Sequence, residues 1–406
     1  MDRVISTQLA VAAGNSKALT IVASSAFVLT GVVTTFLGPI LPTLASRWAL
    51  SDSQGGYFLA TQFLGSILGV SISSMLLPRR GFRFSIALSY CLMAAGVGGL
   101  IVEQWRLALL GTLTFGIGLG VAIPSTNLLI STVNPEHRAS ALSILNFCWG
   151  LGAVLAPLAL IFFARWDHAR PFVPALSGFL LLSVLGLILS PDGPPHTEER
   201  PSSAGEEPPS KSFIAALGGM FFLYVAIEAS VGGWIATLAQ REAAGTGPGW
   251  ALAPMYFWAG LLGGRGTAPI VLRRVHERTL ALTSLAVACS GICILILSSH
   301  LHWINVAGVV TGWGLAAVFP ITIALLSNFP MMEKQIAGPM FGLAGLGGTI
   351  MPWLVGVIST ASRSLQKGLM APLLAALLLF CLHALTNRSI GSAHKFSTQK
   401  PAGDPD

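Results

Sequence analysis

Long apolar segments, each able to cross a lipid bilayer as a helix, recur along almost the whole sequence. A helix needs about 20 apolar residues to cross a hydrocarbon core of roughly 30 Å. Hydrophobic residues make up 53% of the chain and charged residues only 10%, whereas soluble domains carry about 25% charged residues. The pattern predicts an all-α membrane protein.

Twelve such segments can be marked, so we predict twelve transmembrane helices. The first continues through Pro39 and Pro42 with no small-residue cleavage site, which indicates a retained helix and not a signal peptide. The expected spans are Ala18–Leu44, Gly55–Leu77, Phe84–Val102, Leu107–Thr132, Ala139–Phe163, Phe172–Leu189, Phe213–Ala239, Ala251–Leu272, Leu280–Ser298, Ile304–Leu326, Ile336–Thr360 and Leu369–Leu385.

Basic residues between the spans predict the orientation of the chain. With the N-terminus inside, fifteen of the 23 Lys and Arg residues fall in cytoplasmic segments, and the opposite side holds Arg47, Arg106, Arg165, Arg170, Arg241, Arg363 and Lys367. Cytoplasmic loops carry the excess of Lys and Arg. We therefore expect a multi-pass protein of the cell (inner) membrane with both termini cytoplasmic. The net charge of +7 reflects this distribution and does not indicate a nucleic-acid partner.

A polar stretch rich in Pro, Ser and Glu separates the sixth and seventh spans. It has too little apolar material to pack, as is typical of a flexible linker. The expected organisation is an N-terminal six-helix bundle (1–190), a cytoplasmic linker (191–212), a C-terminal six-helix bundle (213–388) and a cytoplasmic tail (389–406).

The two halves carry an internal repeat. The segment Gly116–Pro124 in the fourth span matches Gly312–Pro320 in the tenth, and Gly150–Pro157 in the fifth matches Gly345–Pro352 in the eleventh. Thr43–Arg47 recurs as Thr237–Arg241. The offsets of 196, 195 and 194 are nearly equal, so the six-helix unit is duplicated in the same orientation. Transporters that rock two halves about a central site use this plan.

With twelve spans in two repeated halves, the chain resembles the major facilitator superfamily. The loop after the second span contains Arg79, Arg80, Gly81 and Arg83, which resemble that family's cytoplasmic Gly-x-x-x-Asp-Arg-x-Gly-x-Arg motif. Pro78 stands where the motif has its aspartate, and Ser74 where it has its first glycine. The resemblance implies two six-helix bundles that alternate access to a central site, with this loop taking part in gating.

Within the superfamily, three segments are similar to the fucose/glucose/galactose permease group. They are Tyr224–Trp234, Phe257–Arg265 and Gly314–Pro320. The resemblance implies a monosaccharide-type solute and proton symport. The proton-driven members of that group carry acidic residues in the first and fourth spans, where this chain has Thr30, Thr34, Thr35 and Asn127. The coupling carboxylate is then Glu228, or the protein is a uniporter.

Two ionisable residues lie within the predicted spans, Glu228 in the seventh and Arg265 in the eighth. A charge at the centre of a spanning helix costs roughly 2.5–3.5 kcal/mol on insertion scales, so each needs a partner or a function. Glu228 could exchange the coupling proton, with Arg265 adjusting its affinity. Alternatively the two form a fixed ion pair that only stabilises the second half.

A sugar site needs amide and hydroxyl groups beside aromatic faces. We expect the solute to contact such residues near mid-span, namely Gln62, Asn127, Asn146, Trp149, Tyr224, Trp258 and Phe341. No cofactor and no metal site are predicted, and the expected partners are a sugar-like small molecule, protons and membrane lipid, with the protein acting as a monomer.

Three alternatives remain at this stage. An exporter of amphipathic compounds would need a cavity lined mainly by Phe and Met. A membrane-embedded enzyme would need a paired acid and base or a metal cluster at one depth, and the sequence has no such grouping. A sensor would need a signalling domain, for which neither tail is long enough.

Overall fold

The computed structural model describes residues 2–160, 171–190, 210–242, 247–327 and 330–397, and over these ranges every regular element is a helix. The first half contains α1 (Asp2–Thr35), α2 (Leu37–Trp48), α3 (Asp52–Gly98), α4 (Trp105–Val133), α5 (Arg138–Leu160) and α7 (Phe172–Leu189), with a 3-10 turn, η1 (Gly99–Ile101), after α3. The second contains α8 (Lys211–Glu242), η3 (Gly247–Leu252), α9 (Ala253–Leu272), α10 (Glu277–Leu297), α11 (Leu301–Ala316), α12 (Val318–Ser327), α13 (Pro330–Ser362), α14 (Leu365–Gly368) and α15 (Met370–Ser397).

The predicted spans correspond to these helices. Ten helical segments of the described chain are long and apolar enough to cross a membrane, and one of them, Asp52–Ile101, contains two predicted spans. The eighth predicted span corresponds to α9, a helix of 20 residues. The predicted fold class, an all-α bundle of twelve spanning helices, is confirmed.

Prolines explain two breaks inside predicted spans. Proline lacks the N–H that would bond to the carbonyl four residues earlier. Pro39 lies four residues after Thr35, where α1 ends, and Pro320 lies four residues after Ala316, where α11 ends. The first and tenth spans are each two helical pieces for this reason.

The opposite effect occurs in α3, where two predicted spans are joined with hardly any loop. Gly81 has φ 76° and ψ 177°, which sharply redirects the chain within the element Asp52–Gly98. Such a backbone conformation is accessible to glycine and strained for other residues. Gly81, predicted from its place in the loop motif, thus forms the turn between the second and third spans.

The repeat seen in the sequence recurs in how the helices cross. A Cβ on Gly152 would lie 1.9 Å from the carbonyl oxygen of Val28, where α5 crosses α1. In the second half, a Cβ on Gly347 would lie 2.0 Å from the carbonyl oxygen of Phe222, where α13 crosses α8. Both members of the second pair lie 195 or 194 residues after their counterparts. Only glycine permits these close approaches, so the repeated glycines hold equivalent crossings.

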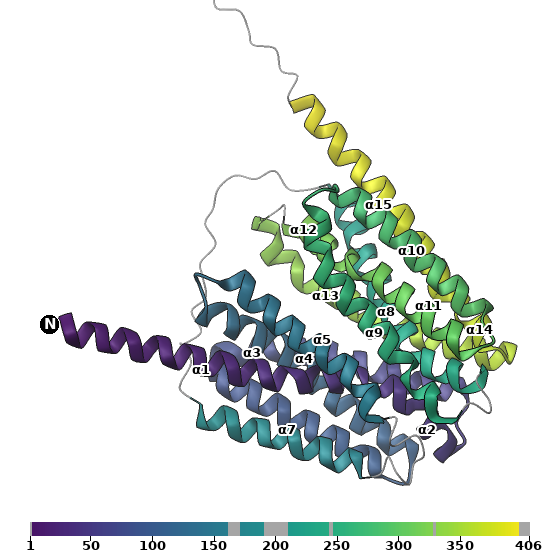
Figure 1. The fold of residues 1–406 in the computed structure, drawn as a ribbon, viewed down its shortest axis with the longest axis horizontal. Helices are drawn as coiled ribbons and strands as arrows, with labels where there is room; N and C mark the ends of the chain where they lie inside the picture. The colour runs from purple at the N-terminus through teal and green to yellow at the C-terminus, as the bar shows by residue number, and fades with distance from the viewer. Residues whose placement is uncertain (1, 161–170, 191–209, 243–246, 328–329, 398–406) are drawn as a thin grey trace, which may run out of the picture.

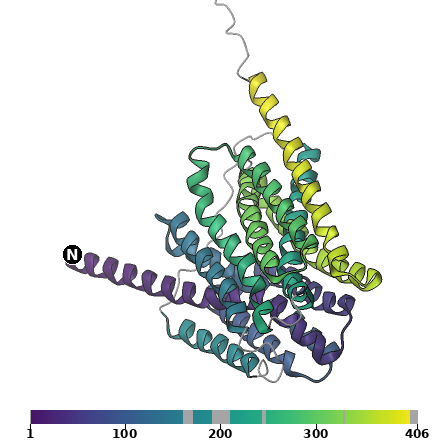
Figure 2. The ribbon, with the colours of Figure 1, turned by 45° about the vertical axis from the view of Figure 1, so that its right-hand side comes forward.

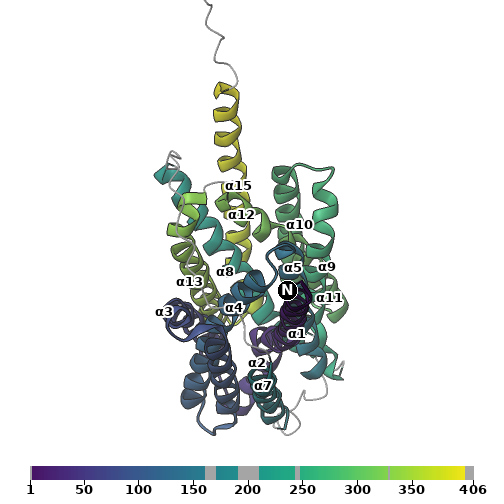
Figure 3. The ribbon, with the colours of Figure 1, turned by 90° about the vertical axis from the view of Figure 1, so that its left-hand side faces the viewer.

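The helices of each half lie together, and the halves diverge toward one end of the molecule (Figure 1). The start of α1 and the end of α15 project at that end, which we call the termini side (Figures 1 and 2). The opposite end, where α2 ends and α14 lies, is called the Asp52 side. The halves meet where α13 packs beside α3 and where α5 packs beside α9 (Figure 3).

The predicted domain boundaries stay a prediction. Most of the linker, 191–209, and the end of the tail, 398–406, lie outside the described residues. The helix α15 extends to Ser397, twelve residues beyond the end expected for the last span at Leu385.

Candidate functional site

A cavity of about 290 Å³ lies between the two halves. Its walls come from α1 to α5 of the first half and from α8, α9 and α12 of the second. The glycines Gly38 and Gly232 let α2 and α8 approach at this point, since a Cβ on Gly38 would lie 2.4 Å from the carbonyl oxygen of Gly232. At this part of the wall, α2 of the first half and α8 of the second are in direct backbone contact.

Seven of the nine side chains predicted for solute binding or coupling line this one cavity. They are Gln62, Asn146, Trp149, Tyr224, Glu228, Trp258 and Arg265. The other two lie elsewhere. Asn127 donates its side-chain N–H to the carbonyl oxygen of Ile123 in its own helix, at 2.8 Å. Phe341 lines a smaller hollow of about 100 Å³ between α3 and α13.

The sequence reading missed several lining residues. Phe27, Phe63 and Phe319 add aromatic surface, and Thr34 adds a hydroxyl group. Phenylalanine is common throughout membrane spans, so its spacing gave no signal that separates cavity from lipid. Two aromatic side chains of the cavity wall pack on each other: Tyr224 stacks on Phe319 with ring centroids 4.9 Å apart.

The amides of the first half are already partly engaged. Gln62 donates from Nε2 to the carbonyl oxygen of Thr34 at 2.8 Å and so ties α3 to α1. Asn146, on α5, donates from Nδ2 to the carbonyl oxygen of Leu142 at 2.8 Å. Trp149 donates from Nε1 to the hydroxyl of Thr34 at 3.3 Å. The amide oxygens of Gln62 and Asn146 are the groups best placed to accept hydrogen bonds from a solute.

The second half contributes the charged groups. A guanidinium nitrogen of Arg265 lies 3.8 Å from a carboxylate oxygen of Glu228 and donates to the hydroxyl of Tyr224 at 3.4 Å. The guanidinium carbon of Arg265 also lies 5.8 Å from the ring centroid of Trp149, which belongs to the other half. The ion pair is therefore long, and Arg265 faces the first half across the cavity.

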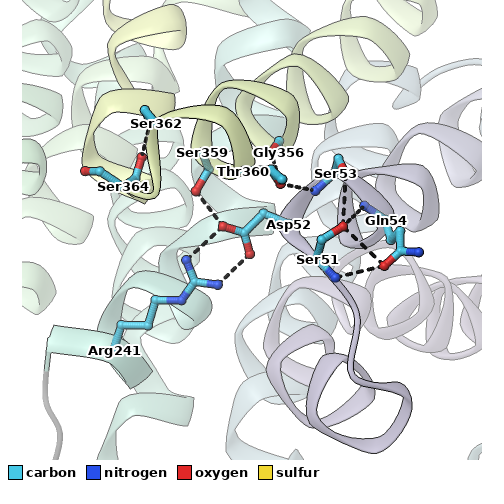
Figure 4. A network of polar contacts seen from close by, with 10 residues as sticks. All are labelled: Ser51, Asp52, Ser53, Gln54, Arg241, Gly356, Ser359, Thr360, Ser362 and Ser364. Atoms are coloured by element: carbon cyan, nitrogen blue, oxygen red, sulfur yellow. Dashed lines mark hydrogen bonds and ion pairs between the residues drawn. The ribbon is translucent and has the colours of Figure 1, made fainter.

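Polar contacts close the Asp52 side by joining the two halves (Figure 4). Asp52, at the start of α3, accepts hydrogen bonds from Arg241 at 2.8 and 2.5 Å and from the Ser359 hydroxyl at 2.5 Å. The backbone N–H of Ser53 donates to the Thr360 hydroxyl at 2.9 Å. These partners lie at the ends of α8 and α13, so one carboxylate of the first half holds two helices of the second.

The indole of Trp234 braces the second half at the closed end and packs against the first half. Trp234 is buried in α8 and donates from Nε1 to the carbonyl oxygen of Pro352 at 2.9 Å. The ring of Trp234 also lies 3.4 Å from the position of a Cβ on Gly55 in the first half. The Asp52 side is thus closed by packing as well as by charge.

On the termini side, the loop predicted to take part in gating has defined contacts. Arg83 donates to the carbonyl oxygen of Ser190 at the end of α7. The guanidinium carbon of Arg80 lies 5.6 Å from the ring centroid of Phe84, and Arg79 is exposed. The contact of Arg83 with Ser190 and that of Arg80 with Phe84 both lie within the first half. Among the residues that the structure describes, no three metal-ligating side chains come together.

The residues 23–335 match the family model of the Major Facilitator Superfamily. The chain belongs to this superfamily of transporters, as the sequence reading expected.

Known relatives include proteins with different cargoes. Over 127 residues the chain is 32% identical to the niacin transporter NiaP of Acinetobacter baylyi, a match that covers 30% of this chain and 28% of that protein. It is 21% identical over 375 residues to the human sodium-dependent glucose transporter 1, covering 82% of this chain and 72% of the relative. The chain thus spans less than a third of the niacin transporter's length in that match.

The fold is also found in solved structures. A bacterial homolog of the human lysosomal transporter Spinster, in an inward-facing and unoccupied conformation, superposes with a TM-score of 0.77 at 14% identity. The superposition covers 92% of this chain and 97% of the other. At this identity the likeness establishes the fold alone.

Proposed function

We propose that the protein is a secondary transporter that carries a small polar solute across the membrane by alternating access. The central cavity is the observation that supports this, because it is lined from both halves and closed at one end by contacts between them. A site at the interface of two repeats fits transporters that rock one half against the other. Such rocking would break the Asp52 contacts, so that the cavity opens on the Asp52 side and closes on the termini side.

We further propose that the termini side faces the cytoplasm and that the protein is a multi-pass protein of the cell membrane. The excess of Lys and Arg in the segments on that side supports this orientation. The described conformation is then closed to the outside. One chain is the transport unit, because the cavity lies wholly within it.

The solute we propose is of monosaccharide size. Gln62, Asn146 and Tyr224 offer hydrogen-bonding groups, and the indoles of Trp149 and Trp258 offer faces for the apolar side of a ring. The name of the human relative, a glucose transporter, is in line with this. Among the described residues that line the cavity, Glu228 is the one carboxylate, so proton symport would use it.

The composition of the cavity wall weighs against an exporter of amphipathic compounds. Such an exporter would need a wall formed mainly by Phe and Met. Within the part of the chain that the structure describes, three phenylalanines and no methionine line the cavity. A compact solute held by a few polar groups fits this wall better.

Uptake into proteoliposomes tests the proposal. Purified protein preloaded with an unlabelled monosaccharide should accumulate the labelled sugar by counterflow, and an inward proton gradient should drive accumulation above equilibrium. Glu228→Gln should abolish the gradient-driven accumulation and retain counterflow. Equal equilibrative uptake by both proteins would instead indicate a uniporter, and loss of counterflow for every small solute tested would contradict transport.

A further inference from the structure

Arg265 has more hydrogen-bond donors than the protein fills. A guanidinium carries five N–H donors in a planar fork. Within the described residues, its Nε is buried without a partner, Tyr224 lies at the long distance of 3.4 Å, and Glu228 lies at 3.8 Å. Hydrogen bonds between arginine and a carboxylate are normally about 2.7–2.9 Å long. Arg265 lines the cavity and its side chain is 27% exposed, so the terminal nitrogens of the guanidinium are available for an acceptor that the protein itself does not supply.

Trp258 presents a second unfilled donor at the same cavity. Its side chain is almost completely buried, and its Nε1 has no hydrogen-bond partner among the described residues. An indole N–H can only donate, and buried donors are rarely left unpaired. The Nε of Arg265 and the Nε1 of Trp258 are enclosed by protein in this conformation, so acceptor oxygens of a solute would reach them only when the two halves move.

The rest of the cavity wall selects the body of that solute. Trp149 lies between the two donors, edge-on to Trp258 at 5.9 Å between centroids and 5.8 Å from the Arg265 guanidinium carbon. With Phe27 and Phe63 also on the wall, a volume of about 290 Å³ fits one ring with few substituents. Flat apolar surfaces pack well against aromatic side chains.

We propose that the solute is a ring-sized carboxylate, a sugar acid or an aromatic acid, whose carboxylate binds Arg265 in place of Glu228. This rests on the proposed function, since it takes the cavity as the transport site. As the halves move around the solute, an oxygen of its carboxylate or of a ring substituent accepts a hydrogen bond from the N–H of Trp258.

The exchange of partners couples a proton to the solute. Tyr224, Glu228 and Arg265 are the titratable groups among the lining residues. When the solute carboxylate takes Arg265, Glu228 would be left as an unpaired carboxylate at membrane depth, which is strongly unfavourable. Glu228 therefore takes up one proton from the adjoining solution as the anion binds, and the pair crosses with no change in net charge.

Binding to the full-length protein in detergent, measured by isothermal titration calorimetry, tests this. The probes form two pairs of similar shape, D-glucuronate with D-glucose and benzoate with benzamide. At least one carboxylate should bind at least about tenfold more tightly than its neutral partner, as expected for charge-assisted hydrogen bonds. The pair that shows the difference identifies the source of the carboxylate.

Variants assign the binding to the two donors. Arg265→Gln should weaken the preferred carboxylate by about tenfold or more, Arg265→Lys should weaken it less, and Trp258→Phe, which keeps a ring, should cost about fivefold. Arg106→Gln and Trp303→Phe are matched controls, because Arg106 and Trp303 are exposed on the surface. Both controls should bind like the wild type.

Proton uptake distinguishes the exchange from simple charge attraction. Titrations in buffers of different ionisation enthalpy should show about one proton taken up per carboxylate bound. Glu228→Gln, which imitates the protonated acid, should bind the carboxylate without proton uptake.

Three results would overturn the inference: neutral probes that bind as tightly as the carboxylates, Arg265→Gln with wild-type affinity, or no binding of either carboxylate. Sugar counterflow in proteoliposomes would still test the proposed transport function separately, because a carrier of neutral sugars would pass that assay and fail this one.

Discussion

The two ends of the molecule are closed to different degrees, although the two halves repeat each other in sequence. On the Asp52 side, one carboxylate and two hydroxyl groups bridge the halves through hydrogen bonds, and the ring of Trp234 packs against Gly55 of the other half. On the termini side the helices diverge (Figure 1), and in the arginine loop Arg83 bonds to Ser190 and Arg80 lies over Phe84, both within the first half. The difference teaches that the closed end is held by few, identifiable side chains that can be removed singly.

Two arginines at equivalent repeat positions make the same point. Arg47 donates to the carbonyl oxygens of Leu100 and Ile101 in its own half and lies 3.5 Å from Glu103. Arg241 instead binds Asp52 of the other half. The duplicated unit therefore uses one arginine to brace a half and its copy to join the halves.

Removing the charge of Asp52 should have the largest effect on this comparison. Asp52→Asn weakens the bonds from Arg241 and Ser359, and we expect it to destabilise the closed Asp52 side by about 2 kcal/mol, since hydrogen bonds to charged groups contribute about 1.5–3 kcal/mol and Arg241 is partly exposed. The measurement is the rate at which a thiol reagent modifies a single cysteine introduced on the cavity-facing surface of the Asp52 side, and this rate should rise. Glu103→Gln is the matched control, because its ion pair lies within one half; an equal rise there would contradict the account.

Adding a larger side chain where Gly56 of α3 meets Trp353 of α13 should also destabilise the closed Asp52 side, by slightly less than Asp52→Asn does. A Cβ on Gly56 would lie 3.0 Å from the Cα of Trp353 in the other half. Gly56→Val should weaken the closed end by about 1–2 kcal/mol, since added methyl groups in packed interfaces cost about 1–3 kcal/mol. Gly178→Val, at a position with no atom within 4 Å, serves as control in the same accessibility assay. No difference between the two variants would mean that the contact is absent in the membrane.

Loss of the indole hydrogen bond is expected to matter less. Trp234→Phe keeps an aromatic ring, but it removes the bond to the Pro352 carbonyl that braces α8 against α13 and the part of the indole that packs against Gly55 of the first half, which together should weaken the closed end by about 1 kcal/mol. The same assay measures it against Trp303→Phe, whose side chain is exposed. A Trp234→Phe effect larger than that of Asp52→Asn would show that packing, and not the carboxylate, dominates the closed end.

The smallest effect is expected at Thr360. Thr360→Val removes one acceptor for the Ser53 N–H, at a position where water can replace it, so about 0.5 kcal/mol is expected. Thr114→Val, where the hydroxyl donates to the carbonyl oxygen of Leu110 in its own helix, is the matched control. If Thr360→Val and Thr114→Val change the accessibility equally, Thr360 does not stabilise the closed Asp52 side.

The sequence predicted the spans and most of the cavity wall because both follow local rules. Apolar length gave α7 with its observed ends, and rare polar groups within apolar spans, such as Glu228 and Gln62, pointed to the cavity. Amides and charges avoid lipid, so their presence is informative without a structure.

The closed end could not be predicted in this way. Asp52 and Arg241 are 189 residues apart, and each lies at a helix end where a charge is ordinary. Nothing local distinguishes Arg241 from its repeat partner Arg47. Asn127 and Phe341 illustrate the converse limit, because the sequence predicts a depth near mid-span for each but not the direction in which its side chain points.

The central claim is that the two ends open in alternation. Distances between spin labels on a variant without native cysteines test it most directly, with one pair at Gln104 and Lys367 on the Asp52 side and one pair at Glu136 and Glu277 on the termini side, all four being exposed. In the Asp52→Asn background, reconstituted in nanodiscs, the account predicts that the first distance lengthens while the second shortens. If the first lengthens and the second stays unchanged, or if neither moves, alternating access through this cavity is contradicted.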